Sequence, residues 1–236
     1  MVSPDNTSAS EEARIRVAYA SRGKEQFRYS MFAPAQMLTI QERERKLLKL
    51  LARYGQASLE NKRILEVGCG AGLWLREFVR WGARPENIFG IDLLPERIAE
   101  ARRLCPSAIT LQCQSATDLH NLPGLFDVVL QSTVFTSILD SRMKGQVASE
   151  MLRILSPAGL IVWYDFKVSN PANPDVRGVG KKEIKELFSG CRIHLETLTL
   201  APPFGRPIAR ISQSLYIALS GVRVFCTHYL GIIRRA

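Results

Sequence analysis

The chain has 236 residues, of which 46% are hydrophobic and 23% are charged. This composition predicts one ordinary globular domain with a sizeable core, and it indicates no disorder beyond the first dozen residues. The formal net charge is +10, and from Val176 onward ten Lys/Arg outnumber three Glu, which gives a local charge of +7. Two interpretations of this basic C-terminal part remain open: an ordinary solvated surface, or a site for a phosphorylated substrate, a membrane surface or nucleic acid.

The cysteines and the N-terminus bear on the compartment. The five cysteines are widely spaced and include no CxxC pair. Their odd number argues against a disulfide framework or a zinc site, so we expect reduced, mostly packed thiols. The first twelve residues are polar and lack the apolar core of an export signal. We therefore expect a frayed terminus and a cytoplasmic protein.

The N-terminal segment contains two predicted features. Residues 11–36 interleave aromatic and basic side chains, and Pro34 is expected to interrupt any long helix. This segment is predicted to cover a site or to dock its aromatic rings on the core, and the two roles are compatible. Residues 37–54 show the pattern of an amphipathic helix. We therefore expect an N-terminal helical segment or lid over residues 1–56 and the main domain over 57–236.

The chain is organised around the stretch from Arg63 to Phe78. It begins with a short apolar strand, continues through three closely spaced glycines and enters a helix. Such a loop lets a ligand approach the main chain beside the amides that open a helix. Taken alone, the glycine spacing favours a structural turn and a ligand site equally.

The rest of the chain alternates strand and helix patterns. The apolar strand runs are continuous, as in parallel strands covered by helices on both faces, which predicts an open, doubly wound α/β sheet. The tail departs from this alternation, with an insertion at 202–224 between its two strands. We predict strands at 64–67, 87–93, 108–113, 126–130, 160–166, 191–200 and 227–233, helices at 73–81, 95–105, 143–155 and 181–188, and a turn at 156–159.

A site is expected at the carboxyl ends of the parallel strands, where open α/β sheets bind ligands. Asp92 ends the second predicted strand, twenty residues after Gly72. An acid at this position can accept hydrogen bonds from the two hydroxyls of a ribose. Leu73 stands where a dinucleotide fingerprint requires a third glycine. The sequence therefore favours a nucleoside ligand other than a nicotinamide dinucleotide.

Four segments carry a family resemblance: ILEVGCGAG, IDLLPERI, FDVVLQSTVF and LRILSPAGLIVWYDF. In this order they resemble the successive motifs of class I S-adenosylmethionine-dependent methyltransferases, over about residues 62–200. The resemblance implies a Rossmann-like, seven-stranded sheet with an antiparallel last strand. It also implies S-adenosylmethionine as cofactor and S-adenosylhomocysteine as product.

The resemblance assigns roles to individual residues. Where the family often has an acid, this chain has Ser115, and Asp118 is an alternative contact for the adenine. The implied cofactor site has the methionine part held by Glu66, Gly68, Cys69, Gly70 and Gly72, the ribose by Asp92, the adenine by Leu93, Ser115 and Ala116, and the sulfonium facing Gln131 and Ser132.

The acceptor is less well defined by the sequence. FRYSMFAPAQM, WYDFKVSNPANPDVRG and THYLGIIRR resemble segments of methyltransferase-domain proteins encoded with bacterial polysaccharide or secondary biosynthesis genes. This implies O-methylation of a small-molecule, sugar or glycan acceptor. The residues expected to cover or contact the acceptor are Tyr19, Tyr29, Phe32 and Tyr164.

Methyl transfer from a sulfonium requires alignment of the reactants more than a catalytic apparatus. For a hydroxyl acceptor, Asp165 and His228 are the possible general bases. Each has a structural alternative, Asp165 in fixing a loop and His228 as a satisfied sheet histidine. We expect no metal, because Gln131 and Ser132 supply no carboxylate after the fourth strand.

Other partners and activities remain open. QSTV after the fourth strand lacks the motif of enzymes that methylate exocyclic base nitrogens, so DNA is not expected as a substrate. An RNA methyltransferase and a non-catalytic, cofactor-binding accessory subunit are the two alternatives. Residues 206–223 combine an apolar face with flanking arginines, which fits peripheral contact with a membrane. The same pattern also fits a helix packed across the acceptor cleft or in a dimer contact.

Overall fold

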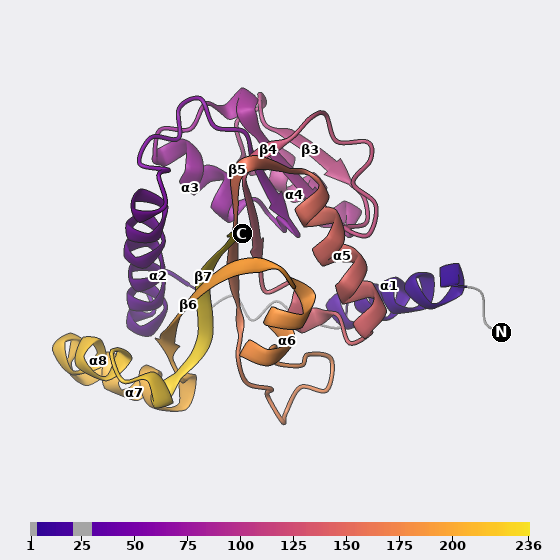
Figure 1. Cartoon of the computed structure of the whole chain (residues 1–236). Coiled ribbons are helices and arrows are strands. Elements are labelled where there is room, and N and C mark those ends of the chain that lie inside the picture. The colour runs from indigo at the N-terminus through magenta and orange to yellow at the C-terminus, as the bar shows by residue number, and fades with distance from the viewer. Residues whose placement is uncertain (1–3, 21–29) are drawn as a thin grey trace.

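The structure, a computed structural model, describes residues 4–20 and 30–236. In this part of the chain, seven strands form one sheet in the order β3-β2-β1-β4-β5-β7-β6 (Figure 1). Tyr29, predicted to cover the site, lies outside the described residues. The strands are β1 Ile64–Val67, β2 Ile88–Asp92, β3 Thr110–Cys113, β4 Phe126–Ser132, β5 Leu155–Phe166, β6 Cys191–Leu200 and β7 Cys226–Arg235, and the α-helices are α1 Pro4–Ala20, α2 Pro34–Arg53, α3 Leu73–Arg80, α4 Pro95–Leu104, α5 Ser141–Arg153, α6 Lys181–Leu187, α7 Pro202–Ile211 and α8 Gln213–Ser220.

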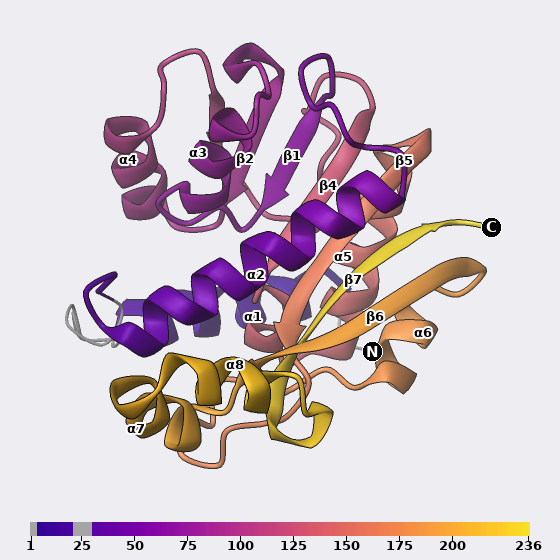
Figure 2. The same ribbon diagram turned by 90° about the vertical axis from the view of Figure 1, so that its left-hand side faces the viewer.

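Helices cover both faces of the sheet and make a three-layer molecule. The core on one face contains side chains of α1, α5 and α6. The core on the other face contains side chains of α2, α3 and α4, and Figure 2 shows α2 running across this face. Successive residues of a strand point to opposite faces, so Leu160 and Ile161 of β5 enter different cores. Continuous apolar strands therefore result from burial on both sides, as the sequence predicts.

The strand order places the carboxyl ends of β1 and β4 side by side. β1 pairs in parallel with both β2 and β4. The chain therefore adds strands first on one side of β1 and then on the other, so the strand order reverses at β1. β7 lies between β5 and β6 and is antiparallel to both. The predicted doubly wound, seven-stranded sheet with an antiparallel last strand is confirmed. Its switch point lies beside the glycine loop, where a ligand is expected.

The N-terminal part differs from the prediction. α1 begins at Pro4, within the twelve residues expected to be frayed. Its polar composition is compatible with a helix because hydrogen bonds to the 137–140 segment, described below, hold α1 on the domain. In most helices an apolar stripe does this. Pro34 opens α2 and does not interrupt a helix, since a proline at the first helical position lacks only an N–H that would have no partner there.

The turn predicted at 156–159 is wrong. These residues continue β5, and Leu155 pairs with Phe126 across an irregularity in the register. α5 correspondingly ends at Arg153 and begins at Ser141, where the Asp140 carboxylate accepts a hydrogen bond from Met143 N at 2.7 Å. Proline and glycine suggested a turn, but residues 156–159 form an irregularity within the strand, between the paired positions Leu155 and Leu160.

The insertion between β6 and β7 folds as a pair of short helices. α7 and α8 meet at Ser212, whose hydroxyl accepts a hydrogen bond from Leu215 N at 3.2 Å and caps α8. Leu200, Ala209 and Tyr216 form a small core with Leu38 of α2. The pair therefore packs against α2 at one end of the sheet (Figure 2). Within the described residues, we find no helix with the length and hydropathy needed to cross a bilayer.

Candidate functional site

The loop between β1 and α3 is built for close approach to its backbone. Gly68 and Gly70 have positive φ angles of +70° and +52°, a region that side chains rarely tolerate. A Cβ on Gly68 would lie 2.4 Å from Cγ2 of Val134, across the space between the loop and the end of β4. Only glycine therefore fits this close packing of the loop against the end of β4.

Asp92 joins the loop to the end of β2. Its carboxylate accepts hydrogen bonds from Gly70 N at 2.8 Å and from Leu94 N at 2.9 Å. Burial raises the pKa of Asp92, and these two backbone hydrogen bonds work against the rise. A carboxylate has about four lone-pair sites, so two remain for hydroxyls of a ligand.

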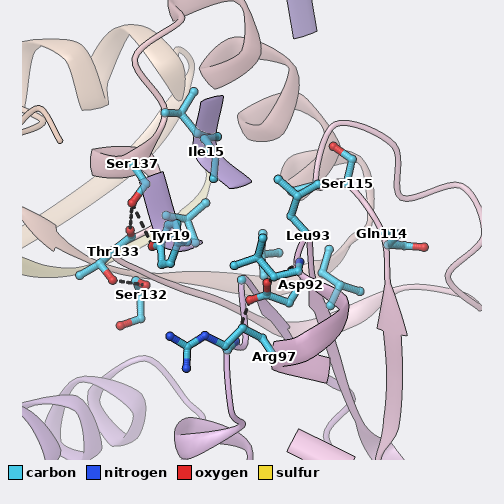
Figure 3. A pocket seen from close by; sticks show the side chains of 18 of the residues that line it. Ile15, Tyr19, Asp92, Leu93, Arg97, Gln114, Ser115, Ser132, Thr133 and Ser137 are labelled. Atoms are coloured by element: carbon cyan, nitrogen blue, oxygen red, sulfur yellow. Dashed lines mark hydrogen bonds between the residues drawn. The ribbon is translucent and has the colours of Figure 1, made fainter. Parts of the chain in front are cut away.

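A cavity of about 260 Å³ lies over these residues, at the carboxyl ends of β1, β2 and β4. Figure 3 shows Asp92, Leu93 and Ser115 on one side of it and Tyr19, Ser132 and Ser137 on the other. Of the residues expected to bind the cofactor or to cover the site, those that line the cavity are Tyr19, Gly68, Gly70, Asp92, Leu93, Ser115, Ala116 and Ser132.

Four residues expected to contact the cofactor do not line this cavity: Glu66, Cys69, Gly72 and Gln131. Gly72 opens α3, and a Cβ there would lie 2.4 Å from Sγ of Cys105. Cys69 is buried, and its amide donates to Ile91 O. These two residues shape the loop from behind.

Glu66 and Gln131 are buried polar residues with incomplete hydrogen bonding. Glu66 Oε2 and Gln131 Nε2 have no partner among the described residues. Burial and the nearby charge of Asp92 raise the pKa of Glu66 well above its ordinary value. Gln131 Oε1 accepts a hydrogen bond from Val134 N at 3.2 Å and so fixes the turn after β4.

α1 covers the cavity from above. Glu11 Oε1 accepts a hydrogen bond from Leu139 N at 2.6 Å, and Arg14 Nη2 donates to Ser137 O at 2.6 Å. Arg16 Nη1 donates to Leu93 O at 2.7 Å, and the Tyr19 and Ser137 hydroxyls lie 3.1 Å apart. The helix is thus bonded to both sides of the cavity that it covers.

A second cavity, of about 570 Å³, adjoins the first. Tyr19, Ser132, Thr133 and Ser137 line both cavities, so the two meet at the carboxyl end of β4. Phe32 stands at the second cavity with 95% of its side chain exposed. The remaining wall comes from α2, β5, α7, α8 and β7, through residues that include Arg43, Tyr164, Arg206, Arg210, Tyr216 and His228.

Backbone strain marks this second cavity. Thr133 and Thr199 have φ angles of 60° and 67°, which β-branched residues rarely adopt. Thr133 N donates to Tyr164 O at 2.8 Å, and Thr199 N donates to Glu42 Oε2 at 3.1 Å. Both threonines line the cavity, and strained residues of this kind concentrate at functional sites.

Asp165 lies beneath the site and lines neither cavity. It is fully buried, and its carboxylate accepts hydrogen bonds from Thr136 N at 3.1 Å, from the Thr136 hydroxyl and from Phe166 N at 2.9 Å. Burial raises the pKa of Asp165 to about 7. These contacts fasten the segment after β4 to β5 and favour loop fixing over general-base catalysis.

His228 lines the second cavity beside Tyr164. The two rings stack with centroids 4.9 Å apart, and His228 Nδ1 lies 2.9 Å from the Thr227 hydroxyl. Burial, assisted by the charge of Arg43, lowers the pKa of His228 to about 3. The imidazole is therefore neutral at physiological pH, and Nε2 makes no hydrogen bond to the described residues.

The second cavity carries positive charge. Among the described residues, its lining includes Arg43, Arg206 and Arg210 and no carboxylate. The Arg43 guanidinium carbon lies 4.2 Å from the ring centroid of Trp74, and Nε of Arg43 is buried without a partner among the described residues. Arg206 and Arg210 form no ion pair with the described residues. This wall suits neutral or anionic ligands.

Asp118 does not take part in either cavity. Its carboxylate accepts hydrogen bonds from His120 N at 3.0 Å and from His120 Nδ1 at 2.8 Å, at the surface. With Glu150 these two residues form a group of possible metal ligands. Arg153 and Leu119 N already bond Glu150. The prediction that the protein uses no metal is not tested by this group.

Several lining residues were missed by sequence reasoning. Gln114 directly follows the third strand, so its position was a signal. Arg97 lies in the first turn of α4. Arg43 lies in a run of charged residues, a pattern that indicates an exposed helix face. Only its packing between Trp74 and Tyr164 distinguishes it from the exposed residues of this run.

Comparison with known sequences identifies the central segment. Residues 64–159 match the family described as "Methyltransferase domain". A ubiquinone biosynthesis O-methyltransferase of Methylocella silvestris is 37% identical over 91 residues, which are 37% of this chain and 34% of the relative. A ribosomal protein L11 methyltransferase of Geobacter metallireducens is 27% identical over 100 residues, which are 42% of this chain and 30% of the relative. The chain thus aligns with about a third of the length of these curated relatives.

Comparison with solved structures extends the likeness to the whole fold. Magnesium protoporphyrin IX methyltransferase from Synechocystis PCC 6803, crystallised with bound SAM, superposes with a TM-score of 0.62 at 14% identity. The superposition covers 95% of this chain and 97% of that one. Residues 64–159 therefore carry a methyltransferase domain, and the strand order and the superposition give the chain the fold of class I S-adenosylmethionine-dependent methyltransferases.

Proposed function

We propose that the protein transfers a methyl group from S-adenosylmethionine to a hydroxyl of a small biosynthetic acceptor. The observation that carries this proposal is the junction of the two cavities at Ser132, Thr133, Ser137 and Tyr19. A cofactor in the first cavity and an acceptor in the second would meet there. The relatives differ in their acceptors, so the acceptor class rests on the second cavity.

The residues of the first cavity fit the cofactor. Gly68 and Gly70 line this cavity, so the methionine part would have access to the loop backbone. Asp92 has acceptor capacity left for the ribose hydroxyls, and Leu93 with Ala116 offers apolar contact to the adenine.

When bound, the cofactor supplies an activated methyl group on its sulfonium. The work of the protein is then to align the acceptor oxygen with the bond that breaks and to exclude water. Thr133 and Ser137 at the junction, held by the bonds to Tyr164 O and Tyr19, provide fixed walls for this alignment. The α1 helix closes the first cavity above them.

The charge of the second cavity favours oxygen as the methylated atom. Arg43, Arg206 and Arg210 repel an ammonium group, and they lower the pKa of an acceptor hydroxyl by stabilising its anion. His228 is neutral, so its Nε2 is able to accept a hydrogen bond from that hydroxyl. With a pKa of about 3 it is a weak base, which suits a phenolic or similarly acidic acceptor better than an ordinary alcohol.

The size of the second cavity favours a small acceptor. Its volume of about 570 Å³ lies within the range of sites for drug-sized ligands. A small-molecule or glycan unit therefore suits the site better than folded RNA.

The five cysteines are free thiols, which supports a cytoplasmic location.

Incubation with methyl-labelled cofactor and separated fractions of small metabolites, glycans, RNA and protein tests this function. We expect the label in a small-metabolite or glycan fraction, in an ether linkage. The Gly68→Val variant serves as the inactive control, because a side chain at this positive φ angle would collide with Val134 and distort the loop that lines the cavity. Label in RNA or protein would overturn the acceptor class. Tight cofactor binding without labelling of any fraction would indicate an accessory subunit.

A further inference from the structure

The helical pair between β6 and β7 exposes a cluster of apolar side chains. Seven of the fifteen exposed large hydrophobic residues of the described chain fall within residues 204–225. Ile211 and Val224 are the most exposed of these, at 83% and 77%. The ring centroids of Phe204 and Phe225 lie 6.0 Å apart, so the start of α7 and the segment before β7 share one surface. Scattered exposed apolar residues are normal, whereas a cluster of this size indicates a binding surface.

The charges around this cluster are all of one sign. No Asp or Glu follows Glu196 in the sequence, and Arg206, Arg210 and Arg223 lie within the exposed segment. None of these arginines forms an ion pair with the described residues. Lys167 adds a fourth cation, because its Nζ donates to Arg223 O at 2.8 Å. The surface is therefore apolar with a basic border.

We propose that the α7–α8 pair and the segment up to Phe225 dock on an anionic membrane surface. Figures 1 and 2 show α7 and α8 together at one end of the molecule, where they pack against α2. Apolar side chains at such a tip can enter the headgroup region while the arginines meet lipid phosphates. A protein partner would need no such uniform charge, and the lack of acids makes pairing with a second copy of the same surface repulsive.

The docking surface borders the second cavity. Gly205, Arg206 and Arg210 of α7 and Tyr216 of α8 line that cavity. Docking would place its opening at the bilayer surface, where an amphiphilic acceptor could enter without leaving the lipid. This consequence rests on the proposed methyl transfer, whereas the docking itself is independent of catalysis.

Cosedimentation with vesicles tests the docking, using the full chain without cofactor. We expect binding to vesicles of mixed phosphatidylcholine and phosphatidylglycerol at low salt, much weaker binding at high salt, and little binding to phosphatidylcholine alone. Ile211→Ser combined with Val224→Ser should lower the partition coefficient by about tenfold or more, because apolar area no longer leaves water. Arg223→Gln should lower it about fivefold through the loss of one charge near the surface.

Matched controls lie elsewhere on the molecule. Leu104→Ser removes a 50% exposed apolar side chain from the end of α4, and Arg192→Gln removes an exposed charge at the start of β6. Both should leave vesicle binding unchanged, and unchanged circular dichroism verifies the fold of every variant. The proposal is overturned if the wild type does not cosediment, if the controls lower binding as much, or if light scattering shows a dimer that Ile211→Ser dissociates.

Discussion

The carboxylate of Asp92 orders the glycine loop through Gly70 N and lines the first cavity. We propose that it also binds the ribose, and a substitution can separate this role from the stability of the fold. Asp92→Ala should weaken binding of S-adenosylhomocysteine by about 5- to 150-fold, as loss of a buried hydrogen-bonding partner costs about 1–3 kcal/mol. Isothermal calorimetry measures the affinity.

Asp127 provides the matched control for Asp92. It accepts a hydrogen bond from Arg63 N at 2.9 Å, at the opposite end of the parallel strands. Asp127→Ala should cost stability and leave the cofactor affinity unchanged. Equal affinity losses in the two variants would mean that Asp92 acts only through the fold.

His228 and Asp165 should give opposite pH dependences of the free energy of unfolding. The pKa of His228 falls from 6.5 to about 3 in the folded state, so the unfolded chain binds more protons between these values and stability falls as pH drops below 6.5. The pKa of Asp165 rises from 3.8 to about 7, so its contribution to stability is present at low pH and is lost as pH rises from 3.8 through 7. In the wild type the two effects largely cancel between pH 4 and 6.5.

Single substitutions should therefore reveal each slope. Asp165→Asn leaves only the effect of His228. The free energy of unfolding, measured with urea, should then rise as pH rises from about 4 to 6.5, by about 2 kcal/mol between pH 5 and 6.5. His228→Gln leaves the aspartate effect and should give the reverse slope. Parallel pH profiles for the two variants would contradict the assignment of these buried groups.

At the residue scale, the sequence predicts those contacts that follow from chain position. Gly68, Gly70 and Asp92 lie at the ends of strands β1 and β2, where the sheet geometry requires them. Glu66 does not line the cavity, because it lies one residue before Val67 in β1 and alternation points it to the opposite face. Arg43 comes from a helix that joins the site only through tertiary packing.

At the scale of elements, α1 is held over the cofactor cavity by Glu11. Hydrogen bonds from Arg14, Leu139 and Asp140 outweigh the effect of burial and lower the pKa of Glu11. Glu11→Gln should therefore loosen α1 and speed its amide exchange by roughly tenfold, since a hydrogen bond to a charged group contributes about 1.5–3 kcal/mol. Hydrogen exchange read by mass spectrometry over residues 8–20 measures this.

The neighbouring Glu12 is the control, because it makes no hydrogen bond to the described residues. Glu12→Gln should leave the exchange of α1 unchanged. Bound S-adenosylhomocysteine should slow the exchange of α1 in the wild type. If exchange of α1 is indifferent both to Glu11→Gln and to the ligand, α1 does not serve as a cover.

The central elements were predictable and the two ends were less so. Continuous apolar runs such as residues 160–163 identify parallel strands because both faces of the sheet are buried. α1 has no apolar stripe, because hydrogen bonds to the 137–140 segment hold it on the domain. Hydrogen bonds of this kind leave no periodic pattern in the sequence. The break at Ser212 between α7 and α8 is a local cap inside an otherwise helical pattern.

At the scale of the whole molecule, the sheet brings two cavities together at one strand end. The parallel half, from β3 to β4, holds the cavity for the cofactor, and the half that contains β5, β7 and β6 supports the wall of the second cavity. The parallel half of the sheet follows from the fold that the chain shares with known methyltransferases. α2, α7 and α8 contribute to the wall of the second cavity, so we expect these elements to determine which acceptor binds.

The central claim, that the cavity at the glycine loop is the site of S-adenosylmethionine, is tested most directly by calorimetric titration with S-adenosylhomocysteine. We predict one ligand bound per wild-type chain and no measurable binding to Gly68→Val, whose fold is verified by circular dichroism. Absence of binding to the wild type, or equal binding to a folded Gly68→Val variant, would contradict the claim.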